Sequence, residues 1–92
     1  MAVPTPAELM VPILKFSKDG EDKDIQETLE YLKRELKLTK EEANVKTPHG
    51  HLILENNIKQ SRKFLVQSGL LEYTSKEHAR ITIAGLKMAN NS

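Results

Sequence analysis

The stretch LILENNIKQSRKFLVQSGLLEYT, residues 52–74, decides the fold that we expect. Its apolar and small side chains recur at the spacing of one helix face, whereas its amides and lysines gather on the opposite face. The inward face is predicted to comprise Leu54, Ile58, Ser61, Leu65 and Ser68. Gly69 follows, and glycine ends helices readily because it adopts left-handed backbone angles without strain. The sequence therefore predicts one long amphipathic helix that ends at Gly69.

A β-hairpin is expected directly after this helix. Residues 70–74 and 79–82 are short strand candidates, and the polar residues 75–78 form a turn between them. Thr82 can then cap a last short helix through Met88, with residues 90–92 expected to fray. A long helix that runs into a two-stranded ribbon is the layout of a winged helix, in which the helix reads DNA and the hairpin is the wing.

The helices upstream are predicted from their capping boxes, in which a Ser, Thr or Asp cap is followed three residues later by Glu. These boxes pair Thr5 with Glu8, Asp24 with Glu27 and Thr39 with Glu42. The first helix should end near Gly20 and be kinked by Pro12, which lacks a backbone N–H. The second should bury Ile25, Leu29, Leu32 and Leu36. Residues 19–24 and 45–51 are expected to be a polar turn and a loop.

These elements predict a mainly α fold with a small β-hairpin, a winged helix-turn-helix-like domain that spans residues 1–92 as a single unit. Apolar residues make up 38% and aromatic residues 4%, so the core should be aliphatic. The chain has no cysteine, which excludes disulfides and thiolate metal sites and suits a reducing cytoplasm. We find no run long enough to span a membrane and no basic leader before an apolar segment.

The charge is unevenly distributed along the chain although the net charge is only +1. Residues 1–45 hold 7 basic against 10 acidic side chains, whereas residues 46–92 hold 7 against 3. A basic second half can present one positive face. The alternative interpretation is chance clustering of charges on a solvated surface.

Candidate DNA-binding residues lie on the long helix and on the wing. Amide side chains can pair with adenine, and cationic side chains can pair with phosphates or with guanine. The candidates are Asn56, Asn57, Lys59, Gln60, Arg62, Lys63, Lys76 and Arg80. About four or five neutralised phosphates would give a log–log salt slope near −4. A polar, lysine-rich face is also commonly just solvated, and many winged helices bind proteins or dimerise instead.

Enzymatic chemistry is not expected within these residues. Glu21-x-Lys23 has the spacing of a nuclease motif, but it lies in a polar turn with no strand before it to position a metal. His49 and His51 have no third metal ligand nearby in the sequence. We therefore expect no catalytic residue, no metal and no cofactor.

The chain also resembles a known family, the Mrr-type restriction endonucleases that cut modified DNA. The segment MAVPTPAELMVPIL, residues 1–14, is similar to the start of that family, with its unusual combination of a capping box and Pro12. Further similar positions are Leu38, Thr39, Glu41, Glu42, Gly50, Asn56, Leu65, Ser68, Gly69, Leu70, Ile81, Thr82 and Gly85. The likeness covers essentially the whole chain and corresponds to the family's N-terminal winged helix domain.

This resemblance implies a module that binds double-stranded DNA, while a separate C-terminal domain, missing here, does the cutting. The further partners that it leaves open are a tethered C-terminal nuclease domain and a second copy of the chain. Where the family often has Trp and Arg, this chain has Gln60 and Asn57. The alternatives are a protein-interaction or dimerisation module and a stand-alone transcription regulator.

Overall fold

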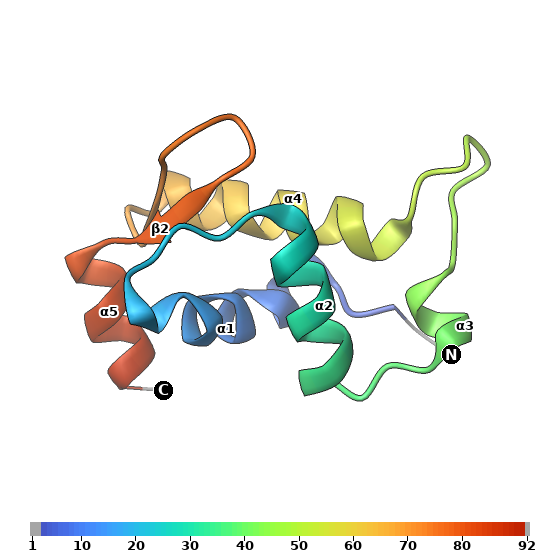
Figure 1. Cartoon of the computed structure of the whole chain (residues 1–92), viewed down its shortest axis with the longest axis horizontal. Helices are drawn as coiled ribbons and strands as arrows, with labels where there is room; N and C mark the ends of the chain where they lie inside the picture. Colours follow the sequence, from blue (N-terminus) through green and yellow to red (C-terminus); the bar gives the residue numbers. More distant parts are fainter. Residues whose placement is uncertain (1–2, 92) are drawn as a thin grey trace.

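Helices dominate the computed structural model, which describes residues 3–91, and a single antiparallel hairpin accompanies them there (Figure 1). In chain order the elements are α1 (Pro6–Phe16), the 3-10 turn η1 (Ser17–Asp19), α2 (Ile25–Glu35), α3 (Lys40–Ala43), α4 (Ile53–Gln67), β1 (Leu71–Tyr73), β2 (Ala79–Ile81) and α5 (Ile83–Asn90). The predicted fold class, mainly α with a small hairpin in a winged helix-like order, is confirmed.

The three capping boxes form as the sequence predicts. The side chains of Thr5, Asp24 and Thr39 each accept a hydrogen bond from the backbone amide three residues on. The glutamate at that position in turn accepts a hydrogen bond from the backbone amide of the cap residue. Four orphan amides begin every helix, and these reciprocal bonds satisfy part of that requirement. α1 continues through Pro12 to Phe16 and passes into η1, which Gly20 ends with a φ of 79°.

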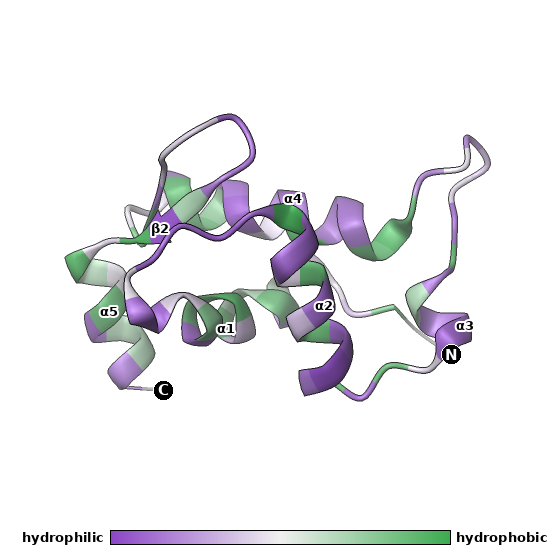
Figure 2. Ribbon diagram, in the orientation of Figure 1, coloured by the Kyte–Doolittle hydropathy of each residue, from purple (hydrophilic) through white to green (hydrophobic). Residues whose placement is uncertain are grey.

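The core is aliphatic and lies where α1, α2 and α4 pack against one another. Leu9, Leu32, Leu54, Ile58 and Leu65 are fully buried in it. Apolar and polar stretches alternate along the longer helices in Figure 2, as expected for helices that bury one face. Leu36, which we expected on the buried face of α2, lies just after the last turn of that helix and is half-buried.

α4 turns sharply into the hairpin at Gly69, whose φ is 77°. The amides of Gly69 and Leu70 donate to the carbonyls of Val66 and Leu65 at 3.0 and 2.9 Å, so the last helical carbonyls are satisfied. β1 and β2 then pair in register, with Leu71 opposite Ile81. Ser68, predicted on the inward face of α4, is instead exposed at the end of the helix.

Lys23, in the turn before α2, pairs with the free edge of β2 as a short third strand would. Lys23 and Ala79 exchange two backbone hydrogen bonds of 2.9 and 3.1 Å. Residues 19–24 therefore do more than form the polar turn that we expected, because they cover the outer edge of β2. α5 extends two residues past Met88 to Asn90, while Ser92 lies outside the described residues. No helix in residues 3–91 combines the length and the apolar character that a membrane crossing requires.

Candidate nucleic-acid interface

A groove lies between α4, the turn of the hairpin and the start of α2, and we call it the α4–hairpin groove. Its walls come from three elements that are far apart in sequence, so only the folded chain can form it. The residues that line it are Asp24, Ile25, Gln26, Glu55, Lys59, Arg62, Lys63, Tyr73, Ser75, Lys76 and Glu77.

Three predicted lysines gather at this groove. Lys59 and Lys63 project from α4, Lys76 belongs to the turn after β1, and all three are exposed. The Lys59 ammonium lies 3.9 Å from the Glu55 carboxylate, a loose i,i+4 ion pair on the same helix. Such exposed pairs contribute little and exchange readily, so the Lys59 charge can turn to another anion.

Carboxylates partly neutralise the positive charge of the groove. Asp24, Glu55 and Glu77 line it together with the cations of Lys59, Arg62, Lys63 and Lys76. Asp24 already accepts the Glu27 amide hydrogen bond at 2.7 Å as the cap of α2. The groove is therefore only mildly basic, and its attraction for a polyanion is local and not a broad positive field.

Arg62 does not lie on the open flank of α4 where we expected it. Its side chain is 3% exposed, its Nη2 donates to the Glu77 carbonyl oxygen at 3.0 Å, and its Cζ lies 5.9 Å from the Tyr73 ring centre. Burial lowers the pKa of Arg62, and the charges of Tyr73, Asp24 and Glu77 oppose that shift. Leu54, Ile58 and Arg62 are four residues apart in series, so Arg62 continues the buried stripe.

Asn57 and Arg80 are also engaged within the protein. The Asn57 side-chain amide donates to the Pro4 carbonyl oxygen at 2.9 Å and ties the N-terminal segment to α4. Arg80 points to the outer face of the hairpin, where its Nε donates to Glu72 at 2.5 Å, and this contact raises its pKa. Arg80 therefore lies on a different face of the hairpin from Tyr73, which lines the groove.

Asn56 and Gln60 lie on the side of α4 that faces away from the core. Gln60 is exposed and Asn56 is half-buried. Lys63 is on the same side, between these amides and the groove, as its place on the helical wheel requires. Of the eight predicted residues, the structure brings six to the groove or next to it, and one of these six, Arg62, is buried there in contacts with the hairpin. Asn57 and Arg80 lie away from the groove and contact other parts of the protein.

Seven residues that line the groove were not among the predicted site residues, namely Asp24, Ile25, Gln26, Glu55, Tyr73, Ser75 and Glu77. Tyr73 could have been found, because it lies two residues after the buried Leu71 and side chains two apart share one face of a strand. Gln26 offered no local signal, since long-range contacts such as the pairing of Lys23 with Ala79 bring the start of α2 to the hairpin.

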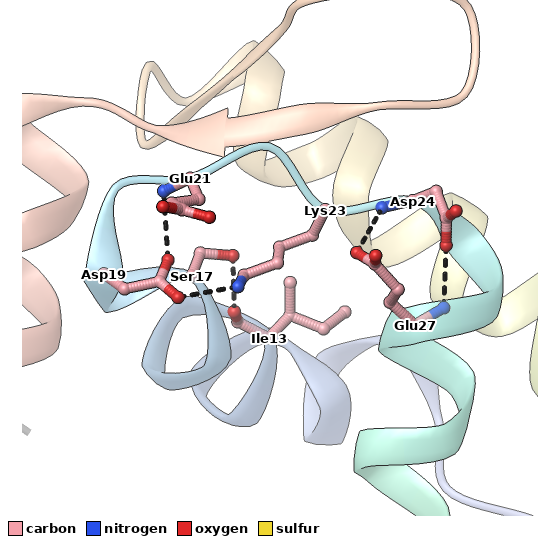
Figure 3. Close-up of polar contacts among 7 residues, drawn as sticks. All are labelled: Ile13, Ser17, Asp19, Glu21, Lys23, Asp24 and Glu27. Carbon is pink, nitrogen blue, oxygen red and sulfur yellow. Dashed lines mark hydrogen bonds and ion pairs between the residues drawn. The ribbon is translucent and has the colours of Figure 1, made fainter.

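The two motifs that we set aside as catalytic or metal-binding lie in the turn after α1 and in an exposed loop. The Lys23 ammonium lies 2.7 Å from Asp19 and 4.8 Å from the centre of the Phe16 ring, so it closes the turn after α1 (Figure 3). The Asp19 carboxylate also accepts the Glu21 amide at 3.0 Å, and these contacts lower its pKa. His49 and His51 are exposed, and residues 3–91 contain no cluster of three or more His, Cys, Asp or Glu side chains suited to a metal.

The comparison with known families agrees with this architecture. Residues 7–91 match the family described as the Mrr N-terminal domain. The chain belongs to that family. The resemblance noted in the sequence is thus confirmed, and membership supports an association with a restriction system. No curated protein and no solved structure matches this Mrr N-terminal domain at a significant level of similarity.

Proposed function

We propose that this Mrr N-terminal domain binds double-stranded DNA, with α4 in the major groove and the hairpin turn against the neighbouring backbone. The observation that carries the proposal is the meeting of Lys59, Lys63 and Lys76, from two separate elements, along one groove. Asn56 and Gln60 on the adjoining side of α4 offer the amide groups that pair with adenine edges.

The dimensions of α4 support this arrangement. α4 has 15 residues and is therefore about 22 Å long, and a B-DNA major groove is about 12 Å wide and admits one α-helix. Lys76 follows β1 at the hairpin turn, beside the same groove as Lys63, so helix and turn can contact one DNA backbone together. Phosphate contacts fix the position of a protein on the duplex, and base contacts add any sequence preference.

The charges support binding of modest strength. With Arg62 buried against the hairpin and Arg80 paired with Glu72 on the outer face of the hairpin, about three lysines remain for phosphates, so we expect a log–log salt slope near −2.7. This is shallower than the slope of about −4 that the sequence alone suggested. We assign no cleavage to these residues and propose the cytoplasm as the location, which suits a chain without cysteine.

A titration with matched charge changes tests the proposal. The triple variant Lys59→Gln, Lys63→Gln, Lys76→Gln is compared with Lys18→Gln, Lys40→Gln, Lys87→Gln, which removes equal charge from exposed residues outside the groove. Fluorescence polarisation with a labelled duplex, repeated at several salt concentrations from low salt upward, gives both the affinity and the salt slope. We expect the groove triple to lose most of the slope and the control to keep it.

Two results would contradict DNA binding through this surface. The first is an affinity that falls equally in both triple variants, because then net charge and not the groove would be responsible. The second is the absence of binding by the unaltered domain at tens of micromolar duplex in low salt, where even non-specific complexes form.

Phe64 favours a second candidate function, docking of a protein on the same helix. Its side chain is 51% exposed on α4, and exposed aromatic side chains are enriched in protein interfaces. A dimer that buries α4 would be seen by sedimentation, would resist competition by DNA and would dissociate on Phe64→Ser. A monomer that binds DNA equally well with Phe64→Ser would exclude this alternative.

A further inference from the structure

The turn of the hairpin, residues 74–78, is held mostly by itself. The amides of Thr74 and Ser75 donate to the His78 carbonyl oxygen at 3.0 and 3.4 Å, and the Ser75 hydroxyl lies 2.9 Å from the His78 ring. Each of these contacts closes the turn without fixing its direction. Something outside the turn must therefore decide where Lys76 points relative to α4.

Arg62 supplies the contact from outside. Across the part of the chain that the structure describes, its bond to the Glu77 carbonyl oxygen is the hydrogen bond that joins residues 74–78 to a helix. Its guanidinium also lies against the ring of Tyr73, the last residue of β1. One side chain of α4 thus contacts the hairpin just before the turn and again within it.

No carboxylate of the described residues pairs directly with the Arg62 guanidinium. None of the ion pairs found among residues 3–91 includes Arg62 although its side chain is buried. Burying a cation in this way is unfavourable unless the N–H donors and the flat face of the guanidinium find partners. The carbonyl of Glu77 and the ring of Tyr73 are such partners, and both belong to the hairpin. Displacing the hairpin would break both contacts at once.

We propose that Arg62 is the positioning residue that fixes the hairpin turn against α4 and thereby sets the separation of Lys76 from Lys63 and Lys59. It does not contact DNA itself. The fixing of the turn stands on the contacts described above, whereas its consequence for DNA binding rests on the proposed function.

An arginine suits this role better than a lysine. The planar guanidinium can stack on an aromatic face and donate in its own plane at the same time, whereas an ammonium is a compact point charge without a stacking plane. Arg62→Lys should keep the charge and lose the fixed geometry. Arg62→Met should lose both while it fills a similar volume with an apolar side chain.

The first experiment measures the order of the turn without DNA. Amide hydrogen exchange and ¹⁵N relaxation are compared for the unaltered domain, Arg62→Lys, Arg62→Met and the exposed control Lys63→Met. We expect the Thr74 and Ser75 amides to exchange at least about tenfold faster in both Arg62 variants, with α1 amides unchanged, since local opening differs from global unfolding. A turn as ordered as in the unaltered domain would overturn the proposal.

If Arg62→Met does not fold, two milder variants test whether Arg62 positions the turn. Arg62→Lys retains the buried cation, and Tyr73→Leu removes the ring while it keeps Arg62 and the Glu77 carbonyl. Faster exchange confined to residues 74–78 in either variant supports a positioning role. Faster exchange spread evenly over α1, α4 and the turn means that Arg62 merely supports the core, and this contradicts the proposal.

The second experiment is a double-mutant cycle in DNA affinity. One phosphate contact is worth about eightfold in affinity near 0.1 M salt, so Lys76→Gln should cost about eightfold in the unaltered domain. In the Arg62→Met background it should cost less than about twofold, because Lys76 no longer points at the backbone. Lys59→Gln on α4 is the control and should cost the same in both backgrounds.

The outcomes separate the two proposals. Additive effects of Arg62→Met and Lys76→Gln would overturn the positioning role while DNA binding stands. No DNA binding by the unaltered domain would overturn the proposed function, and the exchange experiment would still decide whether Arg62 fixes the turn.

Discussion

Two corners of the molecule are built on different principles. At the α4–hairpin corner, residues 61–85, contacts join distant segments, such as Arg62 with Glu77, and Thr82 with Gly69 at 2.6 Å. At the α3–loop corner, residues 39–53, the hydrogen bonds are short-range, such as the Thr47 amide to His51 at 2.8 Å. Tertiary packing therefore specifies the first corner, and turn chemistry specifies the second.

Two glycines express this difference most directly. Gly85 in α5 lies so close to the chain leaving α4 that a Cβ there would overlap the Leu70 carbonyl oxygen and come within 2.7 Å of Ile81 Cγ1. Gly50 in the α3–loop corner has open space around its Cα and is needed for its φ of 85°. One position demands the absence of a side chain, and the other demands a left-handed backbone.

The largest expected effect is that of Gly85→Ala. Alanine normally stabilises a helix relative to glycine by about 1 kcal/mol, but here its methyl group meets backbone that moves only if α5 shifts away from the hairpin. We expect unfolding to become easier by about 3 kcal/mol or more, the upper range for overpacking. Urea unfolding followed by circular dichroism measures this loss. An unchanged or increased midpoint would mean that α5 and the hairpin are not in close contact.

Gly50→Ala should cost less and for a different reason. A left-handed residue with a Cβ costs about 1–2 kcal/mol, and no neighbouring atom adds to that cost. Asn tolerates this conformation better, so Gly50→Asn should recover most of the loss. The same urea titration compares the two variants. Equal losses in both would show that the loop needs glycine for some reason other than its backbone angle.

The sequence predicted local features of both corners well. Capping boxes, the Gly69 stop and the strand candidates depend on residues within about five positions of one another, and each appears near its expected place. Periodicity also identified the buried face of α4 from Leu54 to Leu65. These signals are strong because helix geometry fixes which residues share a face.

The sequence predicted the candidate site less well, because the site depends on long-range contacts. Arg62 carries a charge that suggests solvent, yet the hairpin covers it, and the ring and carbonyl that compensate it lie 11 and 15 residues further along the chain. The residues around Lys23 indicate only a polar turn, and its pairing with Ala79 is visible only in the folded chain. When the partner of a side chain lies beyond a reversal of the chain, local sequence patterns do not reveal whether that side chain is buried or exposed.

Ser61→Ala is expected to stabilise the domain. Ser61 is fully buried on α4, one residue before Arg62, and its hydroxyl has no hydrogen-bond partner among residues 3–91. Burying an unpaired hydroxyl costs about 1–3 kcal/mol, and alanine also favours the helix, so we expect a gain of about 1 kcal/mol. Thermal unfolding measures the gain. A loss of stability would indicate that this part of the core depends on a polar contact at Ser61.

The smallest expected effect is a difference in acid sensitivity between the two corners. The Thr39 backbone amide donates to the Glu42 carboxylate, and this bond, together with the Thr39 hydroxyl, lowers the pKa of Glu42, as Thr5 does for Glu8. A carboxyl group with a lowered folded-state pKa stabilises the fold above its unfolded value and loses that contribution as the pH falls through the folded value. α3 should therefore weaken in acid, below about pH 4.5. The cap of α5 is Thr82 bonded to the Gly85 amide at 3.0 Å, with no carboxylate involved, so it should hold at the same pH.

Glu42→Gln tests this division, with the neighbouring exposed Glu41→Gln as the matched control. Urea midpoints between about pH 6 and pH 3 should fall less steeply for Glu42→Gln than for the unaltered domain, because one acid-sensitive contact is gone. Glu41→Gln should leave the steepness as it is, and hydrogen exchange should show α3 amides opening before those of α5. If α5 opens first in acid, capping carboxylates do not govern the response, and the α3–loop corner is held by contacts other than its own turn chemistry.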